Sequence, residues 1–301
     1  MNVLKNKVSV SLIQLAGSTP DKLHNLKHAH DLIAKCMEKY PKTQVIVLPE
    51  CYNSPYAVDK FREYSEVVEI KESSPSVYQM SNWAKYFKIV LVGGSIPELD
   101  PKSNKVYNTC IVFDANGKIL NKHRKAHLFD IDIPNGITFQ ESATLSGGTQ
   151  ITIVDTELPK RDSTVGQKEF KFGVGICYDM RFPELAMISS RKGCSCMIYP
   201  SAFNTVTGPL HWHLLARSRS IDNEIYTILC SPARSSDKSV YQAYGHSLVC
   251  SPMGEILCEA KEGEEILNCE LDPEAINKAR VSIPINFQRR FDMYPDVSTN
   301  K

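Results

Sequence analysis

Cys177 lies where a catalytic nucleophile could be presented. It follows a run of small and apolar residues, 173–176 (GVGI), and a helix is predicted to begin at residues 182–184 (FPE). At such a strand-to-helix turn, free backbone N–H groups can bind an oxyanion, and the positive end of the helix favours a thiolate. The alternative is a buried core cysteine, the usual environment of a reduced thiol. Catalysis therefore requires a base and an oxyanion donor elsewhere in the chain.

Glu50 and Lys125 follow other strand-like segments and could supply these partners. Glu50 comes directly after residues 44–49 (QVIVLP), and Lys125 lies in the basic and aromatic segment 123–129 (HRKAHLF). Strand ends are where open α/β sheets tend to place ligand sites. Each residue also has an ordinary interpretation, Glu50 as a helix-capping or solvated acid and Lys125 as part of a charged surface run. Together with the thiol, however, they would form the machinery for nucleophilic acyl transfer.

The segments that must position these residues alternate between strand-like and helix-like patterns. Helices are predicted to begin near residues 20, 74, 182, 209 and 272, where proline or acidic residues precede apolar positions at helical spacing. Strand-like runs cover residues 8–16, 44–48, 89–94, 107–113, 170–177, 197–199, 225–231, 245–250 and 255–258. Residues 114–117 (DANG) predict a hairpin turn, and the polar stretch 156–169 predicts a surface excursion. The pattern predicts one layered α/β domain spanning residues 1–301.

The composition is that of an ordinary soluble globular protein. Among 301 residues, 35 Lys and Arg balance 34 Asp and Glu to a formal charge of +1, and 42% of residues are hydrophobic. This near-zero charge gives no general attraction to nucleic acid or to anionic membranes. The longest uncharged stretch, residues 193–216, contains prolines and histidines and predicts no membrane span. Ten cysteines are too sparse for a disulfide scaffold, so we expect a reduced, cytoplasmic protein.

Three motifs together resemble the nitrilase superfamily of carbon-nitrogen hydrolases. They are Leu48-Pro49-Glu50, residues 124–128 (RKAHL) and residues 175–184 (GICYDMRFPE), in this order along the chain. The resemblance implies a catalytic triad of Glu50, Lys125 and Cys177, and an auxiliary Glu141 within residues 138–142 (TFQES). It also implies a four-layer α-β-β-α sandwich, usually paired into an eight-layer dimer. We therefore expect a homodimer in which the segment beyond Ile283 reaches across to the partner or packs back on the dimer edge.

Other segments resemble the ω-amidase branch of this superfamily. They are residues 51–56 (CYNSPY), 127–132 (HLFDID) and 200–209 (PSAFNTVTGP), with Tyr52 standing where a phenylalanine is common. The branch implies hydrolysis of the side-chain amide of 2-oxoglutaramate, with 2-oxosuccinamate and succinamate as related substrates, in glutamine and asparagine metabolism. Deaminated-glutathione amidases share the triad and are the alternative within the family. A nitrilase-fold scaffold without catalytic activity is the alternative from another class.

The implied mechanism passes through a thioester on Cys177. Glu50 would accept the thiol proton, protonate the departing ammonia and later deprotonate water, while Lys125 and the backbone N–H of Tyr178 would hold the oxyanion. Glu141 would orient Lys125 or help to position water.

The implied substrate carries a second carboxylate, for which the sequence offers further candidates. Arg181 supplies a fork of donors, Thr207 a hydroxyl and Phe203 a pocket wall, while Tyr52 could also contact the pocket. The alternative for Arg181 is a structural salt bridge.

Two alternatives, a metal site and a different type of cysteine hydrolase, would use histidines or cysteines other than Cys177. The pairs of ligand-type residues at short spacing are Cys194 with Cys196, His211 with His213, and His123 with His127. None has the spacing of a known zinc motif, so we predict no metal and no other cofactor. A papain-like hydrolase would instead use His246 or His211 as the base for the cysteine.

Overall fold

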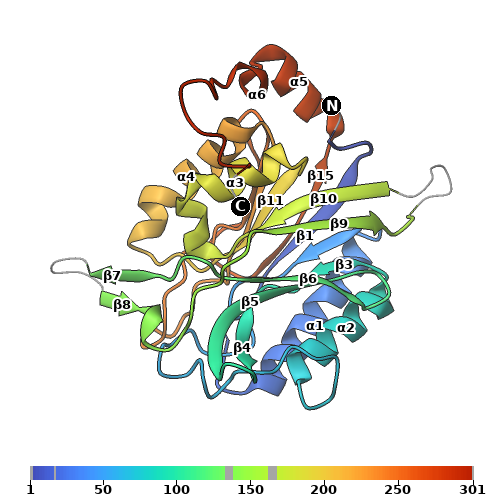
Figure 1. Ribbon diagram of the computed structural model, residues 1–301. Coiled ribbons are helices and arrows are strands. Elements are labelled where there is room, and N and C mark those ends of the chain that lie inside the picture. The colour runs from blue at the N-terminus through green and yellow to red at the C-terminus, as the bar shows by residue number, and fades with distance from the viewer. Residues whose placement is uncertain (1–2, 17, 133–137, 162–167, 300–301) are drawn as a thin grey trace.

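Two β-sheets packed face to face form the centre of the molecule (Figure 1). The computed structural model describes residues 3–16, 18–132, 138–161 and 168–299. The first sheet has the strand order β15-β1-β2-β3-β5-β4 with β6 beside β5, and its strands are β1 (Val8–Gln14), β2 (Val45–Val47), β3 (Val90–Val92), β4 (Ile96–Asp100), β5 (Lys105–Phe113), β6 (Ile119–Arg124) and β15 (Glu265–Leu271). The second has the order β14-β13-β12-β11-β10-β9, with β9 (Thr152–Leu158), β10 (Lys168–Val174), β11 (Cys196–Pro200), β12 (Tyr226–Cys230), β13 (Leu248–Cys250) and β14 (Ile256–Glu259).

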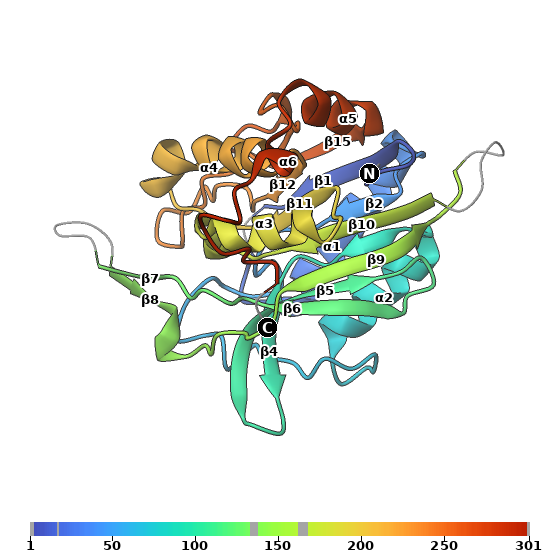
Figure 2. The ribbon, with the colours of Figure 1, turned by 45° about the horizontal axis from the view of Figure 1, so that its top comes forward.

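Helices cover the outer face of each sheet and complete four layers (Figures 1 and 2). The first sheet carries α1 (Lys22–Lys39) and α2 (Pro75–Phe87), and the second carries α3 (Pro183–Arg191) and α4 (Thr207–Asn223). The chain ends with α5 (Pro273–Ser282) and α6 (Ile285–Gln288). The predicted α-β-β-α sandwich is therefore confirmed. No helix among the described residues combines the length and apolarity needed to cross a bilayer.

The core between the sheets follows from the valine-rich central strands. In β2 and β3 every residue is buried, as expected for parallel strands covered on both faces. Alternate side chains point in opposite directions, so Val45 and Val47 face the second sheet while Ile46 faces α1 and α2. Phe170 and Phe172 meet them from β10. The carboxyl ends of the strands are thereby held at fixed positions around the site.

Local signals explain where α1 begins. The side chain of Asp21 accepts a hydrogen bond from the His24 N–H at 3.0 Å, which caps the first turn. Leu26, Ala29 and Ile33 then recur at helical spacing and are buried. The buried stripe packs this helix against the first sheet.

Several predicted boundaries differ from the structure. The strand predicted over residues 8–16 ends at Gln14, and the helix predicted from residue 209 begins at Thr207. The predicted surface excursion 156–169 is wrong at its ends, because residues 156–158 belong to β9 and residues 168–169 to β10. Residues 162–167 of that stretch lie outside the described residues.

The segment beyond Ile283 runs back over the second helical layer within the same chain. Arg191 at the end of α3 pairs with Asp296 at 2.5 Å, and its guanidinium lies 4.4 Å from the ring centre of Phe291. The described part of this segment thus packs against its own chain. Its contact with a partner chain stays a prediction.

Candidate active site

The four residues predicted to be catalytic come from four connections at one end of the sheets. Glu50 follows β2, Lys125 follows β6 and Cys177 begins the 3₁₀ turn Cys177–Arg181 after β10. Glu141 begins a second turn, Glu141–Ala143, after the small hairpin of β7 (Asp130–Asp132) and β8 (Thr138–Gln140). All four side chains are buried, with at most 4% of each exposed. The structure therefore brings together the groups that are widely separated in the sequence.

Lys125 lies between two carboxylates. Its Nζ is 3.0 Å from Glu50 Oε1 and 2.9 Å from Glu141 Oε1, and all three side chains are buried. Burial by itself lowers the pKa of Lys125, but the charges of Glu141 and Glu50 outweigh it and hold that pKa well above its ordinary value. The lysine is therefore a fixed cation in the floor of the site.

The two oxygens of Glu50 have different surroundings. Oε1 accepts hydrogen bonds from Asn108 Nδ2 at 2.8 Å and from Lys125 Nζ at 3.0 Å, and the Tyr56 hydroxyl lies 3.5 Å from it. Oε2 is buried and has no partner in the described residues. Burial is the largest cause that raises the pKa of Glu50, and the charge of Glu141 raises it further. Oε2 is therefore the oxygen available to exchange a proton.

Glu141 is hydrogen-bonded through both oxygens. Its Oε1 accepts from Lys125 Nζ and, at 2.9 Å, from the Tyr56 hydroxyl, while Oε2 accepts from the Phe129 N–H at 2.8 Å. Burial and the nearby carboxylates raise the pKa of Tyr56 well above its ordinary value, so its hydroxyl stays a donor. This bonding suits Glu141 to hold Lys125 rather than to move protons.

Cys177 is presented in an unusual backbone conformation. Its φ of 47° lies in the left-handed region, which is uncommon for residues other than glycine and is found at functional turns. Burial and the charge of Glu50 raise the pKa of its thiol well above the ordinary value, against the opposing effects of Lys125 and the Ala202 N–H. The nearby Cys177 thiol in turn lowers the pKa of Glu50, against the larger effect of burial. The resting thiol is thus protonated and next to a base.

Asp179 ties the lysine segment to the cysteine turn. Its Oδ1 accepts from the N–H of His127 at 2.9 Å and is 2.8 Å from His127 Nδ1. Its Oδ2 accepts from the Ile176 N–H at 2.9 Å and is 2.9 Å from His123 Nε2. Burial opposes ionisation, but the bonds from His123 and His127 hold the pKa of Asp179 far below its ordinary value. One buried carboxylate therefore sets the distance between Lys125 and Cys177.

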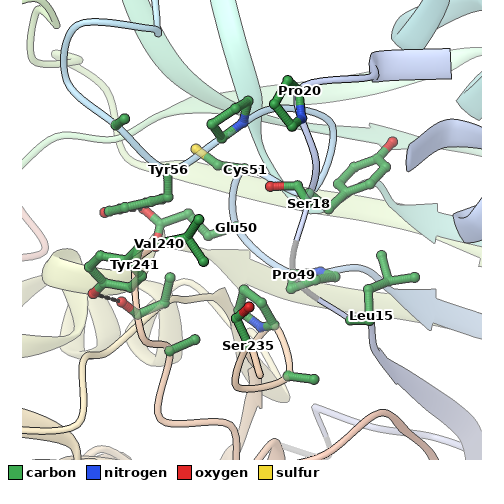
Figure 3. A pocket seen from close by; sticks show the side chains of 18 of the residues that line it. Leu15, Ser18, Pro20, Pro49, Glu50, Cys51, Tyr56, Ser235, Val240 and Tyr241 are labelled. Carbon is green, nitrogen blue, oxygen red and sulfur yellow. Dashed lines mark hydrogen bonds between the residues drawn. The ribbon is translucent and has the colours of Figure 1, made fainter. Parts of the chain in front are cut away.

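A cavity of about 270 Å³ opens beside Glu50 (Figure 3). Tyr56, Tyr241 and Glu50 are grouped at one side of it, and Leu15, Ser18 and Pro20 lie at the other. The remaining lining residues are Ala16, Pro49, Cys51, Tyr52, Pro55, Ala57, Ala202, Pro232, Ala233, Ser235, Ser239, Val240 and Ala243. Most of this wall is apolar, so a small uncharged or partly apolar group fits there better than a charged one.

The predicted substrate-binding residues divide into two groups. Tyr52 lines the cavity, and its buried hydroxyl has no partner in the described residues. Tyr178, Arg181, Phe203 and Thr207 do not line it.

The guanidinium of Arg181 lies between two aromatic rings. Its carbon is 5.0 Å from the ring centre of Phe203 and 5.5 Å from that of Tyr178. The expected alternative of a salt bridge is not seen, because no carboxylate among the described residues is paired with Arg181. Nη1 donates to His211 Nδ1 at 3.2 Å, and Nε is buried without a partner. This arginine therefore keeps an unused buried donor.

Thr207 does not offer a free hydroxyl. Its Oγ1 donates to Asn204 Oδ1 at 3.1 Å, and the same oxygen accepts from the Thr207 N–H at 2.8 Å. Asn204 Oδ1 thus accepts from the backbone at the start of α4, and its buried Nδ2 has no partner in the described chain. The geometry favours the amide of Asn204 over the hydroxyl of Thr207 as a polar group for a ligand.

The histidine-based alternative for the cysteine fails on geometry. His211 accepts a hydrogen bond from Arg181, and His246 lies 2.7 Å from Glu259, so neither is hydrogen-bonded to Cys177. Sequence reasoning did not single out Tyr56, Asn108 or Tyr241. Tyr56 belongs to a motif quoted for the branch, but nothing in the sequence shows that its hydroxyl lies between two carboxylates.

Comparison with known proteins identifies the family. Residues 9–281 match the model of the carbon-nitrogen hydrolase family. The chain belongs to this family. It is therefore a hydrolase that acts on carbon–nitrogen bonds, as predicted, rather than a scaffold without catalytic activity.

Relatives place this carbon-nitrogen hydrolase more narrowly. It is 59% identical to omega-amidase NIT3 of Saccharomyces cerevisiae, over 99% of this chain and 98% of the relative. It is 46% identical to omega-amidase NIT2 of Xenopus tropicalis, over 96% and 97%. The crystal structure of S. cerevisiae Nit3, described as a member of branch 10 of the nitrilase superfamily, matches with a TM-score of 0.85 at 57% identity, covering 96% of this chain and 98% of that one.

Proposed function

We propose that this protein is an ω-amidase that hydrolyses the side-chain amide of 2-oxoglutaramate to the dicarboxylate and ammonia. The observation that carries the chemistry is the unpartnered Oε2 of buried Glu50 beside the protonated thiol of Cys177. The ω-amidase names of two relatives at 59% and 46% identity support the choice within the family. 2-Oxosuccinamate and succinamate are the related substrates that we expect.

The first half-reaction forms a thioester. Glu50 accepts the thiol proton as the sulfur of Cys177 attacks the amide carbon, and the carbonyl oxygen becomes an oxyanion. Lys125 and the backbone N–H of Tyr178 stabilise that charge. Glu50 then gives its proton to the departing ammonia as the carbon–nitrogen bond breaks.

The second half-reaction returns the enzyme to its resting state. Glu50 removes a proton from water, the hydroxide attacks the thioester carbon, and the sulfur leaves and regains the proton. Glu141 holds Lys125 in place through both steps, because its own oxygens are saturated with donors.

We propose that the second carboxylate of the substrate binds Arg181. The unused buried Nε of Arg181 and the unused Nδ2 of Asn204 support this assignment, with Phe203 as the wall under the guanidinium. Because the side chain of Thr207 is committed to Asn204, its contribution is to hold that amide. Tyr52 lines the apolar cavity beside Glu50.

The deciding experiment measures ammonia release from 2-oxoglutaramate, succinamate, deaminated glutathione and a simple nitrile. We expect the highest kcat/KM with 2-oxoglutaramate and no release with Cys177→Ala. A preference for deaminated glutathione would keep the triad and reject the branch. Release that survives Cys177→Ala would reject the thioester mechanism.

We further propose a homodimer formed through the second helical layer. On α4, Leu210 and Leu214 are 64% and 63% exposed, which is an apolar surface suited to a second copy of the same helix. Sedimentation should give about twice the 33.8 kDa mass of one chain. Leu210→Glu with Leu214→Glu should give the single-chain mass while retaining the circular dichroism of the wild type, and an unchanged mass would place the interface elsewhere.

We also propose that residues 1–301 fold as a single cytoplasmic domain. All ten cysteines are free, and eight of them are buried as reduced thiols, which suits a reducing compartment. A single cooperative unfolding transition would support the single domain, and two separate transitions would contradict it.

A further inference from the structure

Three potential metal ligands meet on the surface between α4, the loop before β13 and the end of β14. His213 lies on α4, His246 lies two residues before β13 begins, and Glu259 is the last residue of β14. His213 Nε2 is 2.9 Å and His246 Nδ1 is 2.7 Å from Glu259 Oε1, and the three ligand atoms lie within 4.8 Å of one another. None of the three takes part in the proposed amide hydrolysis.

The donor set matches a transition metal. Two imidazole nitrogens and one carboxylate oxygen are a ligand set typical of Zn²⁺ with an open fourth position. Zinc bonds of about 2.1 Å place two ligands of a tetrahedral site about 3.4 Å apart. Each imidazole nitrogen would therefore have to move away from the Glu259 oxygen by less than an ångström. Small side-chain rotations are enough for such a shift. The metal would take the place of the two imidazole protons that now face this oxygen.

His246 is held in place by its backbone and its ring. Its φ of 57° is left-handed, and so is the φ of 78° at the preceding Gly245. A Cβ added to Gly245 would lie 2.8 Å from Glu262 Cα. The His246 carbonyl accepts from Trp212 Nε1 at 2.7 Å, and its ring stacks on Tyr244 at 4.3 Å. Left-handed residues outside glycine are uncommon and occur at ligand clamps. The imidazole is thus directed at Glu259 before any ligand binds.

The cluster is accessible to an ion from solvent. The side chains of His213, His246 and Glu259 are 32%, 24% and 29% exposed. This leaves room for water as a fourth ligand while keeping the three side chains packed against ordered neighbours. We propose that His213, His246 and Glu259 bind a divalent transition-metal ion, best matched by zinc, with water completing the coordination.

The metal would link one wall of the active-site cavity to α4, which covers the second sheet. The loop between β12 and β13 contributes Pro232, Ser235, Val240 and Tyr241 to the cavity and also includes His246. A metal bound to both His246 and His213 would join this loop to α4 more strongly than the present hydrogen bonds do. This site was not predicted from the sequence, because His213 was paired there with His211, which instead bonds to Arg181.

The test is zinc binding by the full-length protein after treatment with a chelator. Calorimetric titration should give one equivalent of zinc per chain, and His213→Ala, His246→Ala and Glu259→Gln should each weaken binding about tenfold or more. His28→Ala is the matched control, because His28 and Glu264 form a similarly exposed pair at 2.6 Å in which no second imidazole is bonded to the carboxylate, the nearby His24 ring being stacked on His28 at 6.5 Å instead. Zinc should raise the melting temperature of the wild type and of His28→Ala, but not of the three site variants.

Thiols also bind zinc, so a cobalt titration identifies the ligands. Cobalt bound at this site should show no sulfur-to-metal charge-transfer band. Such a band, or binding that is as tight in Glu259→Gln and His213→Ala as in the wild type, would overturn the proposal. Glu259→Gln keeps the size of the side chain and can still bond to the imidazoles, so the test remains valid if His246→Ala does not fold.

Discussion

Asn108→Leu tests whether Asn108 sets the protonation of Glu50. Asn108 Nδ2 donates to Glu50 Oε1 at 2.8 Å, and each residue is 1% exposed. A hydrogen bond to a charged group contributes roughly 1.5–3 kcal/mol, which corresponds to about one to two pKa units. Loss of this donor destabilises the carboxylate, so the pKa of Glu50, already raised by burial, rises further.

The assay is the pH profile of kcat/KM for 2-oxoglutaramate. A higher pKa of the base moves the acid limb of this profile upward by about one to two pH units. At a pH on that limb, kcat/KM should fall roughly 10- to 100-fold, with partial recovery at higher pH. A merely structural role for Asn108 would lower activity equally at every pH.

Asn223→Leu is the matched control for this substitution. Asn223 is also 1% exposed, donates one hydrogen bond from Nδ2 at 2.9 Å to the Arg219 carbonyl, and has an unpartnered Oδ1. It should lower the free energy of unfolding without moving the acid limb. If Asn108→Leu folds and its pH profile matches that of the wild type, the assignment of Glu50 Oε2 as the proton carrier is refuted.

Three further substitutions follow from the same geometry. Lys125→Met should lower kcat about 100- to 1,000-fold in steady-state kinetics, because it removes an oxyanion donor and leaves two buried carboxylates without their cation. Asp179→Asn should lower the free energy of unfolding at pH 7 by about 2 kcal/mol or more in urea titrations. The lowered pKa of Asp179 contributes stability above the ordinary carboxyl pKa, so this difference from the wild type should shrink as the pH falls below about 4. Gly175→Ala should lower the melting temperature, because its Cβ would lie 2.5 Å from Tyr199 Cε1 and overpacking costs about 1–3 kcal/mol.

The local part of the fold was predictable from the sequence because it depends on neighbouring residues. The buried run of β2 and the capped start of α1 are set by residue types within a few positions. The edge strand β15 was not predicted, since it pairs with β1 across most of the chain, Val8 facing Leu271. Its alternating pattern is weak, because residues 266–269 are all buried or half-buried in succession. Such pairing depends on which sheet edge is free, and a single sequence does not show this.

The candidate site also has one part that the sequence predicts and one part that it does not. Glu50, Lys125 and Cys177 each follow a strand, so strand ends and motif order predict their meeting. The difference between the two oxygens of Glu50 depends instead on donors from residues 56, 108 and 125, which arrive on three separate segments. No spacing rule encodes that convergence, because it arises from the packing of β5 and β6 beside the loop after β2.

Asp179 explains why the lysine and cysteine motifs must occur together. The carboxylate bonds to the segment of His123 and His127, which brackets Lys125, and to the Ile176 N–H, which precedes Cys177. The Asp179 carboxylate thus has all its donors only when both motifs are present. A buried carboxylate without its donors is strongly destabilising. Lys125 and Cys177 are in this way fixed to each other through a side chain that is fully buried. The presence of both motifs in one chain is therefore evidence for a shared structural constraint as well as for a shared reaction.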